Sequence, residues 1–281
     1  MKYGFVIPGG DVRDFGELAA EAEAAGWDGM FVADGLDIGF KPDEPFPWFD
    51  PWVALAAMAV ATQQIKLGTF ITPVSRRRPW KLAREVSTLD QLSNGRMILG
   101  VGLGAAQDDG GFYKVGEATD LKVRAQLLDE GLSIMDGLWK GKTVDFKGLH
   151  YRVNKMKMLP RPVQKPRIPV WVVGVWPKQK SMMRVLRWDG LIPQPSGATP
   201  ETKVKVSLFE DVRKYIDEHH PRPAKFDIIS GGTTPGGNSK RAAQKVKPFA
   251  KAGATWWLEH MWEGDPQELK TRLKQGPPRI D

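Results

Sequence analysis

The chain has 281 residues, 41% of them hydrophobic and 26% charged, which is enough for one α/β domain with a large core. It has no cysteine, which excludes disulfides, thiolate metal sites and a cysteine nucleophile, and suits a cytoplasmic protein. The net charge is +8, from 41 basic and 33 acidic residues. Nucleic-acid binders usually gather such charge into one patch, whereas here it is scattered apart from the run Arg76-Arg77-Arg78. We therefore expect no nucleic acid, and the charge equally suits a polyanionic small molecule.

The first half of the chain alternates short apolar runs with amphipathic stretches. We predict strands at 3–7, 28–33, 65–71 and 97–101. A helix over 15–25 ends at Gly26, and a second begins at Asp50-Pro51, an N-cap followed by proline at the first helical position. A third runs from Pro79 to the stop at Asn94-Gly95. No apolar run approaches the roughly 18 residues of a membrane span, and Pro8 interrupts the N-terminal apolar run too early for a signal peptide.

The second half repeats the pattern after one interruption. A helix over 123–139 leads into an excursion at about 140–169, which contains a hairpin around Gly148 and a proline-rich connector. Strands are predicted at 170–173, 190–192, 226–229 and 255–258. The helices between them are expected at 178–187, 200–219 and 240–252, and a last one begins at Asp265-Pro266.

Eight strand–helix repeats favour an α/β fold, namely a closed (β/α)8 barrel with an insertion after strand 4. An open doubly wound sheet is the alternative. No linker rich in glycine or serine divides the chain, so we expect a single domain over 1–281 with its excursion at about 140–169. In such a barrel the chemistry takes place at the C-terminal ends of the strands.

Several blocks of this sequence resemble the luciferase-like monooxygenase family of flavin- and deazaflavin (F420)-dependent enzymes. They are AAGWD at 24–28, DPWVAL at 50–55, LGTFITP at 67–73, the segment 83–104, LDEGL at 128–132, PRPVQKP at 160–166 and RWDG at 187–190. Together these blocks extend over nearly the whole chain. Their order and spacing are more specific to the family than any single block. The resemblance implies a TIM barrel with its insertion after the fourth strand, and a cofactor at the mouth of the barrel.

Candidate cofactor residues follow strands two to four. Asp34 ends the second strand and either lines the cofactor pocket, acts as a base, or merely caps a loop; the histidine that some deazaflavin dehydrogenases have next to it is replaced by Gly35. The resemblance places a non-prolyl cis peptide behind the ring at Phe70-Ile71, with Thr72 beside it. Glycines let a backbone approach a ligand closely, so Gly102 and Gly104 are further candidates, although both also suit a tight turn.

Two further groups could hold a phosphate. Arg124 matches an arginine that contacts the cofactor phosphate in luciferase-type relatives, or is a solvated residue at a helix start. The turn after the fifth strand, with Gly174, Val175, Trp176 and Lys178, resembles the family's phosphate-binding turn, although Val175 replaces a glycine that is common there. Helix N-termini attract anions, and Trp176 either covers the cofactor or packs in the core.

The last candidates are Glu259 and His260, which end the eighth strand at the expected catalytic rim. A rim histidine could exchange a proton near neutral pH, or it could simply be hydrogen-bonded in a loop. No spacing typical of metal ligands occurs, so we expect no metal.

These observations favour an oxidoreductase that transfers hydride between a small organic substrate and F420 or FMN. The short chain and basic balance favour F420, whose tail is polyanionic, and Gly35 argues against a sugar-phosphate dehydrogenase. The alternatives are an FMN-dependent monooxygenase that activates oxygen and a flavin-binding protein without catalysis. The resemblance also makes a homodimer possible.

Overall fold

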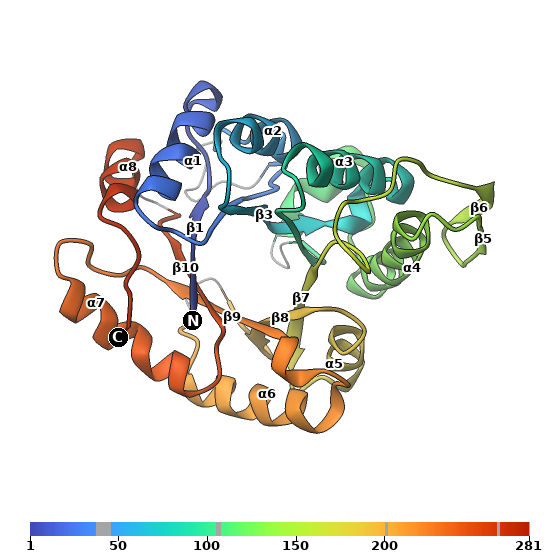
Figure 1. Ribbon diagram of the computed structural model, residues 1–281. Helices are drawn as coiled ribbons and strands as arrows, with labels where there is room; N and C mark the ends of the chain where they lie inside the picture. The colour runs from blue at the N-terminus through green and yellow to red at the C-terminus, as the bar shows by residue number, and fades with distance from the viewer. Residues whose placement is uncertain (38–45, 105–107, 200–201, 263–264, 281) are drawn as a thin grey trace.

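The fold is a closed barrel of eight parallel strands surrounded by helices (Figure 1). The structure is a computed structural model and describes residues 1–37, 46–104, 108–199, 202–262 and 265–280. The strands follow the order β1-β2-β3-β4-β7-β8-β9-β10, and β1 pairs with β10 to close the circle. The predicted (β/α)8 barrel is confirmed and the open sheet is excluded.

All eight predicted barrel strands are present, and several extend further than expected. They are β1 (Lys2–Ile7), β2 (Gly29–Val32), β3 (Lys66–Pro73), β4 (Met97–Gly102), β7 (Val170–Trp176), β8 (Gly190–Pro195), β9 (Asp227–Gly232) and β10 (Trp256–His260). β7, β8 and β9 each end three residues later than predicted, and β7 and β8 stay paired as far as Trp176 and Pro195. Gly174, Val175 and Trp176 therefore belong to a strand, and the turn that we predicted there begins later.

The helices also follow the prediction, with different starting points. They are α1 (Phe15–Ala24), α2 (Pro51–Ala61), α3 (Pro79–Leu92), α4 (Leu121–Trp139), α5 (Gln179–Val185), α6 (Val206–His219), α7 (Ser239–Lys251) and α8 (Pro266–Lys274). Helix α4 begins two residues early because the Asp120 carboxylate accepts a hydrogen bond from the Val123 amide. Helix α6 begins later than predicted. Its flanking residue Lys205 is extended and its side chain accepts no capping hydrogen bond, and Pro200, the predicted start, lies outside the described residues.

Aromatic side chains fill the lower part of the barrel. Phe31, Trp171 and Trp256 pack together with ring centroids 5.1 to 5.9 Å apart. All three are almost completely buried. Since side chains alternate between the two faces of a strand, their positions identify which residues of each strand face the barrel interior. These rings form a closed floor, and any ligand must bind above them.

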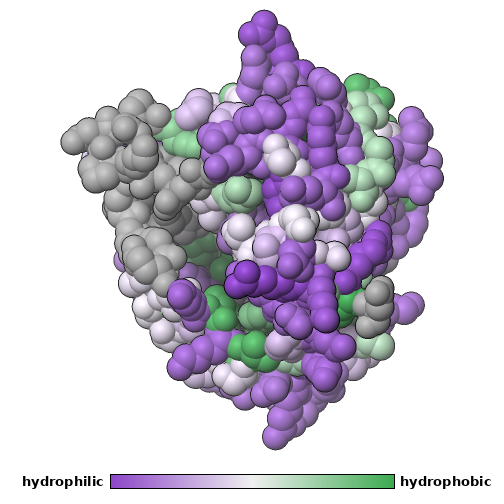
Figure 2. Space-filling model, turned by 90° about the vertical axis from the view of Figure 1, so that its left-hand side faces the viewer, coloured by the Kyte–Doolittle hydropathy of each residue, from purple (hydrophilic) through white to green (hydrophobic). Residues whose placement is uncertain are grey.

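The excursion forms a separate two-stranded antiparallel sheet of β5 (Val144–Lys147) and β6 (Arg152–Met156), beyond α4 at the right of Figure 1. Glu130 of α4 holds its turn, because the carboxylate accepts hydrogen bonds from the amides of Leu149, His150 and Tyr151. On the opposite side of the molecule, the surface that includes α7 and α8 is largely hydrophilic (Figure 2). Within the described ranges, no helix is both long and apolar enough to cross a membrane.

Candidate active site

The mouth of the barrel, at the C-terminal ends of its strands, has an apolar wall above the aromatic floor. Phe70 and Ile71 are joined by a cis peptide bond, as the resemblance implies, and both are partly exposed. Ile71 and Val173 face each other across Gly102: a Cβ on that glycine would lie 2.8 Å from Ile71 Cδ1 and 3.1 Å from Val173 Cγ2. Ile192 is paired with Val173 and packs against the floor. β3, β7 and β8 thus present a partly open apolar surface to a ligand.

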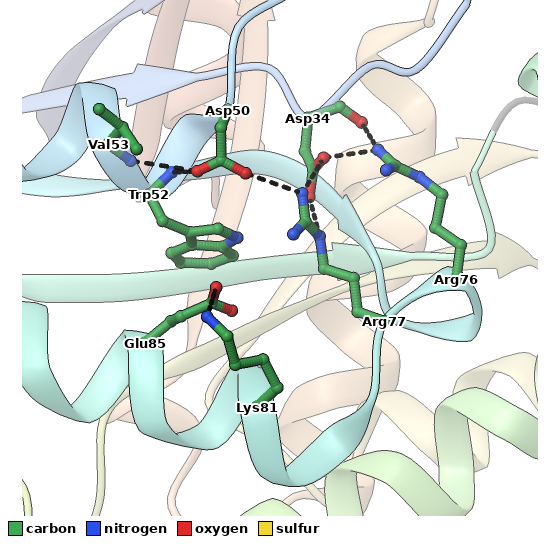
Figure 3. A network of polar contacts seen from close by, with 8 residues as sticks. All are labelled: Asp34, Asp50, Trp52, Val53, Arg76, Arg77, Lys81 and Glu85. Carbon is green, nitrogen blue, oxygen red and sulfur yellow. Dashed lines mark hydrogen bonds and ion pairs between the residues drawn. The ribbon is translucent and has the colours of Figure 1, made fainter.

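Asp34 does not line this wall. It lies two residues beyond Val32, which packs among the helices outside the barrel, and its carboxylate points towards Arg76 and Arg77 (Figure 3). Arg77 donates to both oxygens, over 2.8 and 2.7 Å, and Arg76 donates to Oδ1 over 2.5 Å. The Asp34 side chain is completely buried. With both oxygens bound to guanidinium groups, Asp34 has no direct contact with the mouth and is not placed to act as a base there.

The two arginines come from the short turn η2 (Val74–Arg76) and the residue after it, directly behind β3. Arg77 also lies 3.8 Å from Asp50, the N-cap of α2, and 5.6 Å from the ring of Trp52 (Figure 3). We call Asp34, Arg76, Arg77 and Asp50 the arginine clasp. It ties the ends of β2 and β3 to the start of α2, and so fixes the segment that follows Phe70-Ile71.

The glycine loop after β4 is closed over by the chain itself. Gly104 has φ +88°, and a Cβ there would lie 2.9 Å from the ring of Phe112. Arg124 is completely buried, with its guanidinium 4.8 Å from the Phe112 ring and Nη1 donating to the carbonyl of Leu103. The alternative that Arg124 is a solvated residue at a helix start is therefore wrong. In this structure Arg124 stabilises the loop from inside and does not reach the surface. Thr72 is also fully buried, and its hydroxyl has no hydrogen-bond partner among the described residues.

The predicted phosphate turn is used for packing. Gly174 faces α5, where a Cβ would lie 2.4 Å from Leu191 and 2.7 Å from Val185. The amide of Val175 donates to Ser181 Oγ, and the amide of Lys178 donates to the Val175 carbonyl. Trp176 packs its ring against Tyr215 of α6 rather than over the mouth. The side chain of Lys178, at the end of this turn, is exposed.

Glu259 and His260 point in opposite directions because they are neighbours on one strand. The Glu259 carboxylate is buried outside the barrel, where it accepts hydrogen bonds from Thr234, Trp257 and Arg272. The expectation that it lies at the catalytic rim is wrong, because its position on β10 faces α8. His260 shares the inward face with Leu258 and Trp256, and lies against Gly231 at the mouth.

His260 is held neutral. Burial lowers its pKa from 6.5 to about 4, and the nearby Lys245 ammonium adds to this effect. A neutral imidazole at the mouth can donate a hydrogen bond from one ring nitrogen and accept at the other. It can therefore exchange a proton with a bound substrate while the rest of the wall is apolar.

The His260 ring is expected to titrate near pH 4 in the folded protein. The unfolded chain takes up this proton near pH 6.5, so the contribution of His260 to stability is complete above that pH and is lost as the pH falls. A shift from 6.5 to about 4 corresponds to roughly 3 kcal/mol at pH 4, at about 1.4 kcal/mol per pKa unit. NMR titration of the imidazole measures the pKa, and urea unfolding of wild type and His260→Gln at pH 7 and pH 4 measures the stability. A ring that titrates near 6.5 would contradict this placement.

Two aromatic side chains cover glycines near the mouth. Trp48 covers Gly35 so closely that a Cβ there would lie 2.2 Å from its ring, and Phe46 covers Gly9 in the same way at 2.6 Å. The sequence allows Trp48 to line a substrate cavity or to pack in the core, whereas sequence reasoning missed Phe46. Any side chain at position 35 would displace the Trp48 ring, so the glycine is a packing requirement here.

The comparisons with known proteins agree with this architecture. The model of one family, luciferase-like monooxygenase, matches residues 3–276. The chain belongs to the luciferase-like monooxygenase family. Its relatives include both curated proteins and solved structures.

Among the curated relatives, an F420-dependent glucose-6-phosphate dehydrogenase from Nakamurella multipartita is 32% identical over 218 residues, which cover 77% of this chain and 61% of the relative. A protein of the same name from Amycolatopsis mediterranei is 33% identical over 166 residues, or 59% of this chain and 48% of the relative. The chain thus spans about half to three fifths of the length of these relatives.

Solved structures share the fold at lower identity. An F420-dependent secondary alcohol dehydrogenase, in complex with an F420-acetone adduct, has a TM-score of 0.76 and 20% identity, and the match covers 99% of this chain and 98% of that one. The oxygenating constituent of 3,6-diketocamphane monooxygenase from Pseudomonas putida, in complex with FMN, has a TM-score of 0.64 and 19% identity, with 89% of this chain and 73% of that one covered. Within the described residues, no group of three or more histidine or acidic side chains is placed to hold a metal.

Proposed function

We propose that this protein is an oxidoreductase that uses the deazaflavin F420 to transfer hydride to or from a small organic substrate. The observation that supports this most directly is the apolar wall of Phe70, Ile71, Val173 and Ile192 above a closed aromatic floor. A flat tricyclic ring needs such a surface, and the named curated relatives are F420-dependent enzymes. The basic composition fits a cofactor with an anionic tail.

The residues present fit the ring better than they fit a phosphate group at the expected positions. Ile71 and Phe70 would contact one face of the ring, and Gly102 leaves room beside them. Arg124 and the Val175 amide, in contrast, already have partners within the protein. When bound, a deazaflavin or flavin supplies the hydride chemistry, while the protein supplies orientation, a dry wall and a proton partner. His260, neutral and facing inward, is the residue we assign to hold or release a substrate proton at a ring nitrogen.

Position 35 bears on the class of substrate. The resemblance associates a histidine at this position with deazaflavin dehydrogenases that act on sugar phosphates, and Trp48 leaves no room for one here. We therefore propose a substrate other than a sugar phosphate, even though several of the curated relatives are named for glucose 6-phosphate. The aromatic and aliphatic mouth suits a small and largely apolar molecule.

FMN with oxygen activation is the second candidate, because the same wall would accept an isoalloxazine ring and one structural relative contains FMN. The third alternative, a flavin-binding protein without catalysis, predicts that the bound cofactor is neither oxidised nor reduced by any substrate. A measurement of turnover therefore distinguishes it from the two enzymes. The cytoplasmic location and the lack of a nucleic-acid partner remain predictions.

We also propose a homodimer that forms through α2. This helix contains no polar or charged side chain, and Val53 and Val60 on its outer side are 64% and 65% exposed. A helix that is apolar on all sides is normally buried, and a second copy would present the same apolar stripe. Sedimentation equilibrium tests this pairing: a monomer at all concentrations would exclude it.

The experiment for the proposed function is a fluorescence titration of the apoprotein with F420 and, separately, with FMN. We expect F420 to bind with a 1:1 stoichiometry and to bind more tightly than FMN. Val173→Trp places an indole in the mouth and is expected to weaken binding at least tenfold, which corresponds to about 1.4 kcal/mol. The control, Val163→Trp, changes a valine in the connector that is 44% exposed and should leave affinity unchanged. Binding of neither cofactor would overturn the proposal, and tighter binding of FMN would favour the second candidate.

A further inference from the structure

The helices around the barrel mouth begin with different charges. In this fold every helix that follows a barrel strand begins at the mouth end. Helices α2, α4 and α8 begin at Asp50, Asp120 and Asp265, and each carboxylate accepts a hydrogen bond from its own helix. Acidic residues at these positions stabilise a helix through its dipole. Helix α3, between α2 and α4, is an exception, because it begins at Arg78 and has no acidic residue in its first turn.

The three consecutive helices α5, α6 and α7 break that rule. None has an acidic residue in its first turn. Instead, basic residues lie at or near their mouth ends, and we call this set the basic arc: Lys178, Lys180, Lys203, Lys205, Lys240, Arg241 and Lys245. All seven are exposed. A positive charge beside a helix N-terminus opposes the dipole, so helix stability does not explain the arrangement.

The members of the basic arc lie along one continuous part of the rim. Strands β7, β8 and β9 are neighbours in the barrel, and the loops after the first two are joined by a hydrogen bond from the Ser196 amide to the Trp176 carbonyl. Lys245 reaches back to the mouth, where it donates to the carbonyl of Thr233, and the Thr233 hydroxyl donates to the carbonyl of His260. The arc therefore runs beside the apolar wall and ends next to His260.

The positive charge of the arc is not balanced locally. Among the described residues of 174–183, 196–206 and 233–245 there is no aspartate or glutamate, and Glu201, in the second of these segments, lies outside the described residues. None of the seven side chains forms an ion pair within the part of the chain that the structure describes. The arginine clasp, by contrast, balances its two arginines with Asp34 and Asp50. The arc is thus left to attract an anionic ligand from outside the protein.

We infer that the basic arc binds an extended chain of phosphate and carboxylate groups on a ligand whose ring lies in the mouth, namely the tail of the deazaflavin cofactor. This inference rests on the proposed function. The Val175 amide is already bonded to Ser181, so the exposed lysine side chains at the rim would take over the role that this amide was expected to have. The ring contributes binding through apolar contact, and the arc adds affinity that depends on charge and is screened by salt.

The test compares F420 with the same deazaflavin lacking its phosphate and glutamate tail, using fluorescence titration at low and high salt. Wild type should bind the tailed cofactor more tightly, and added salt should reduce this preference. Lys203→Gln/Lys205→Gln should lower affinity for F420 by roughly 3- to 10-fold, as expected for two exposed charge pairs, and leave affinity for the tail-less ring unchanged. The control, Lys142→Gln/Lys147→Gln, removes the same charge from exposed lysines around β5 and should change neither affinity.

Each other outcome has a definite meaning. An unchanged ratio of the two affinities in the Lys203/Lys205 variant would overturn the inference, and would assign the arc to an anionic substrate or another polyanion. A parallel titration with an oligonucleotide distinguishes these ligands. Loss of oligonucleotide binding in the Lys203/Lys205 variant, with an unchanged ratio of the two deazaflavin affinities, would identify nucleic acid as the ligand. An equal loss for both deazaflavins would show that the lysines act on the fold or the ring site and would also overturn it. Failure of wild type to bind either deazaflavin would refute the proposed function itself.

Discussion

Replacing Asp34 with asparagine is expected to lower the free energy of unfolding by about 3 to 5 kcal/mol, because the largely buried Arg76 loses its carboxylate partner. Arg77 is then left with only the more exposed Asp50, 3.8 Å away. The side chains of Arg76 and Arg77 are only 9% and 17% exposed, and Asp34 is the aspartate that both of them contact. Urea unfolding measures the loss. Cofactor affinity should fall as well, because the clasp fixes the segment directly behind Phe70-Ile71.

The matched control for this substitution is Asp11→Asn. Asp11 also pairs with an arginine, but the two side chains are 47% and 86% exposed, and such exposed pairs contribute little to stability. Equal effects of the two substitutions would contradict the role of the clasp. If Asp34→Asn stayed fully stable, bound cofactor normally and lost only turnover, Asp34 would be the base that our first interpretation allowed.

Glu259→Gln is expected to have a stability effect of similar size, about 3 to 5 kcal/mol, because it removes a buried carboxylate that pairs with Arg272. Both side chains are almost fully buried, at 0% and 6% exposure, with Arg272 Nε 3.3 Å from the carboxylate. In the double variant Glu259→Gln/Arg272→Met, part of the loss should be recovered, since the orphaned charge is gone. Urea unfolding of the four proteins of this cycle measures the coupling.

Glu21→Gln serves as its control, because the partner of Glu21, Lys274, is 53% exposed. That change should cost less than about 1 kcal/mol. A stable Glu259→Gln protein with altered kinetics would instead restore Glu259 as a candidate catalytic residue. A variant that is destabilised but keeps its cofactor affinity would agree with its place between β10 and α8.

The strands and helices could be predicted because each leaves a local signal. Apolar runs, aspartate caps and glycine stops located all eight barrel strands within a few residues. The direction of a side chain at a strand end leaves no such signal. A parallel strand covered on both faces is apolar along its whole length, so the run 28–33 does not reveal that Asp34 points towards the helices. The same holds for Glu259 and His260, of which only one can face the mouth.

Long-range partners were equally hidden in the sequence. The run Arg76-Arg77-Arg78 was noticed only as positive charge, whereas its counter-ion lies 42 and 43 positions earlier. Arg124 was expected near a phosphate, whereas its contacts, Phe112 and the Leu103 carbonyl, lie 12 and 21 positions earlier in the chain. The basic arc also joins three segments that are distant in sequence. The basic residues look scattered in the sequence. Only the order of the strands in the barrel shows that they lie side by side.

The most direct test of the account is a structure of the protein with F420 bound. We expect the ring to lie at the C-terminal mouth, within about 4 Å of Ile71 and Val173, with His260 facing the substrate side and the tail directed towards α5, α6 and α7. A ring bound elsewhere on the protein, with Phe70 and Ile71 closed over the aromatic floor, would contradict it.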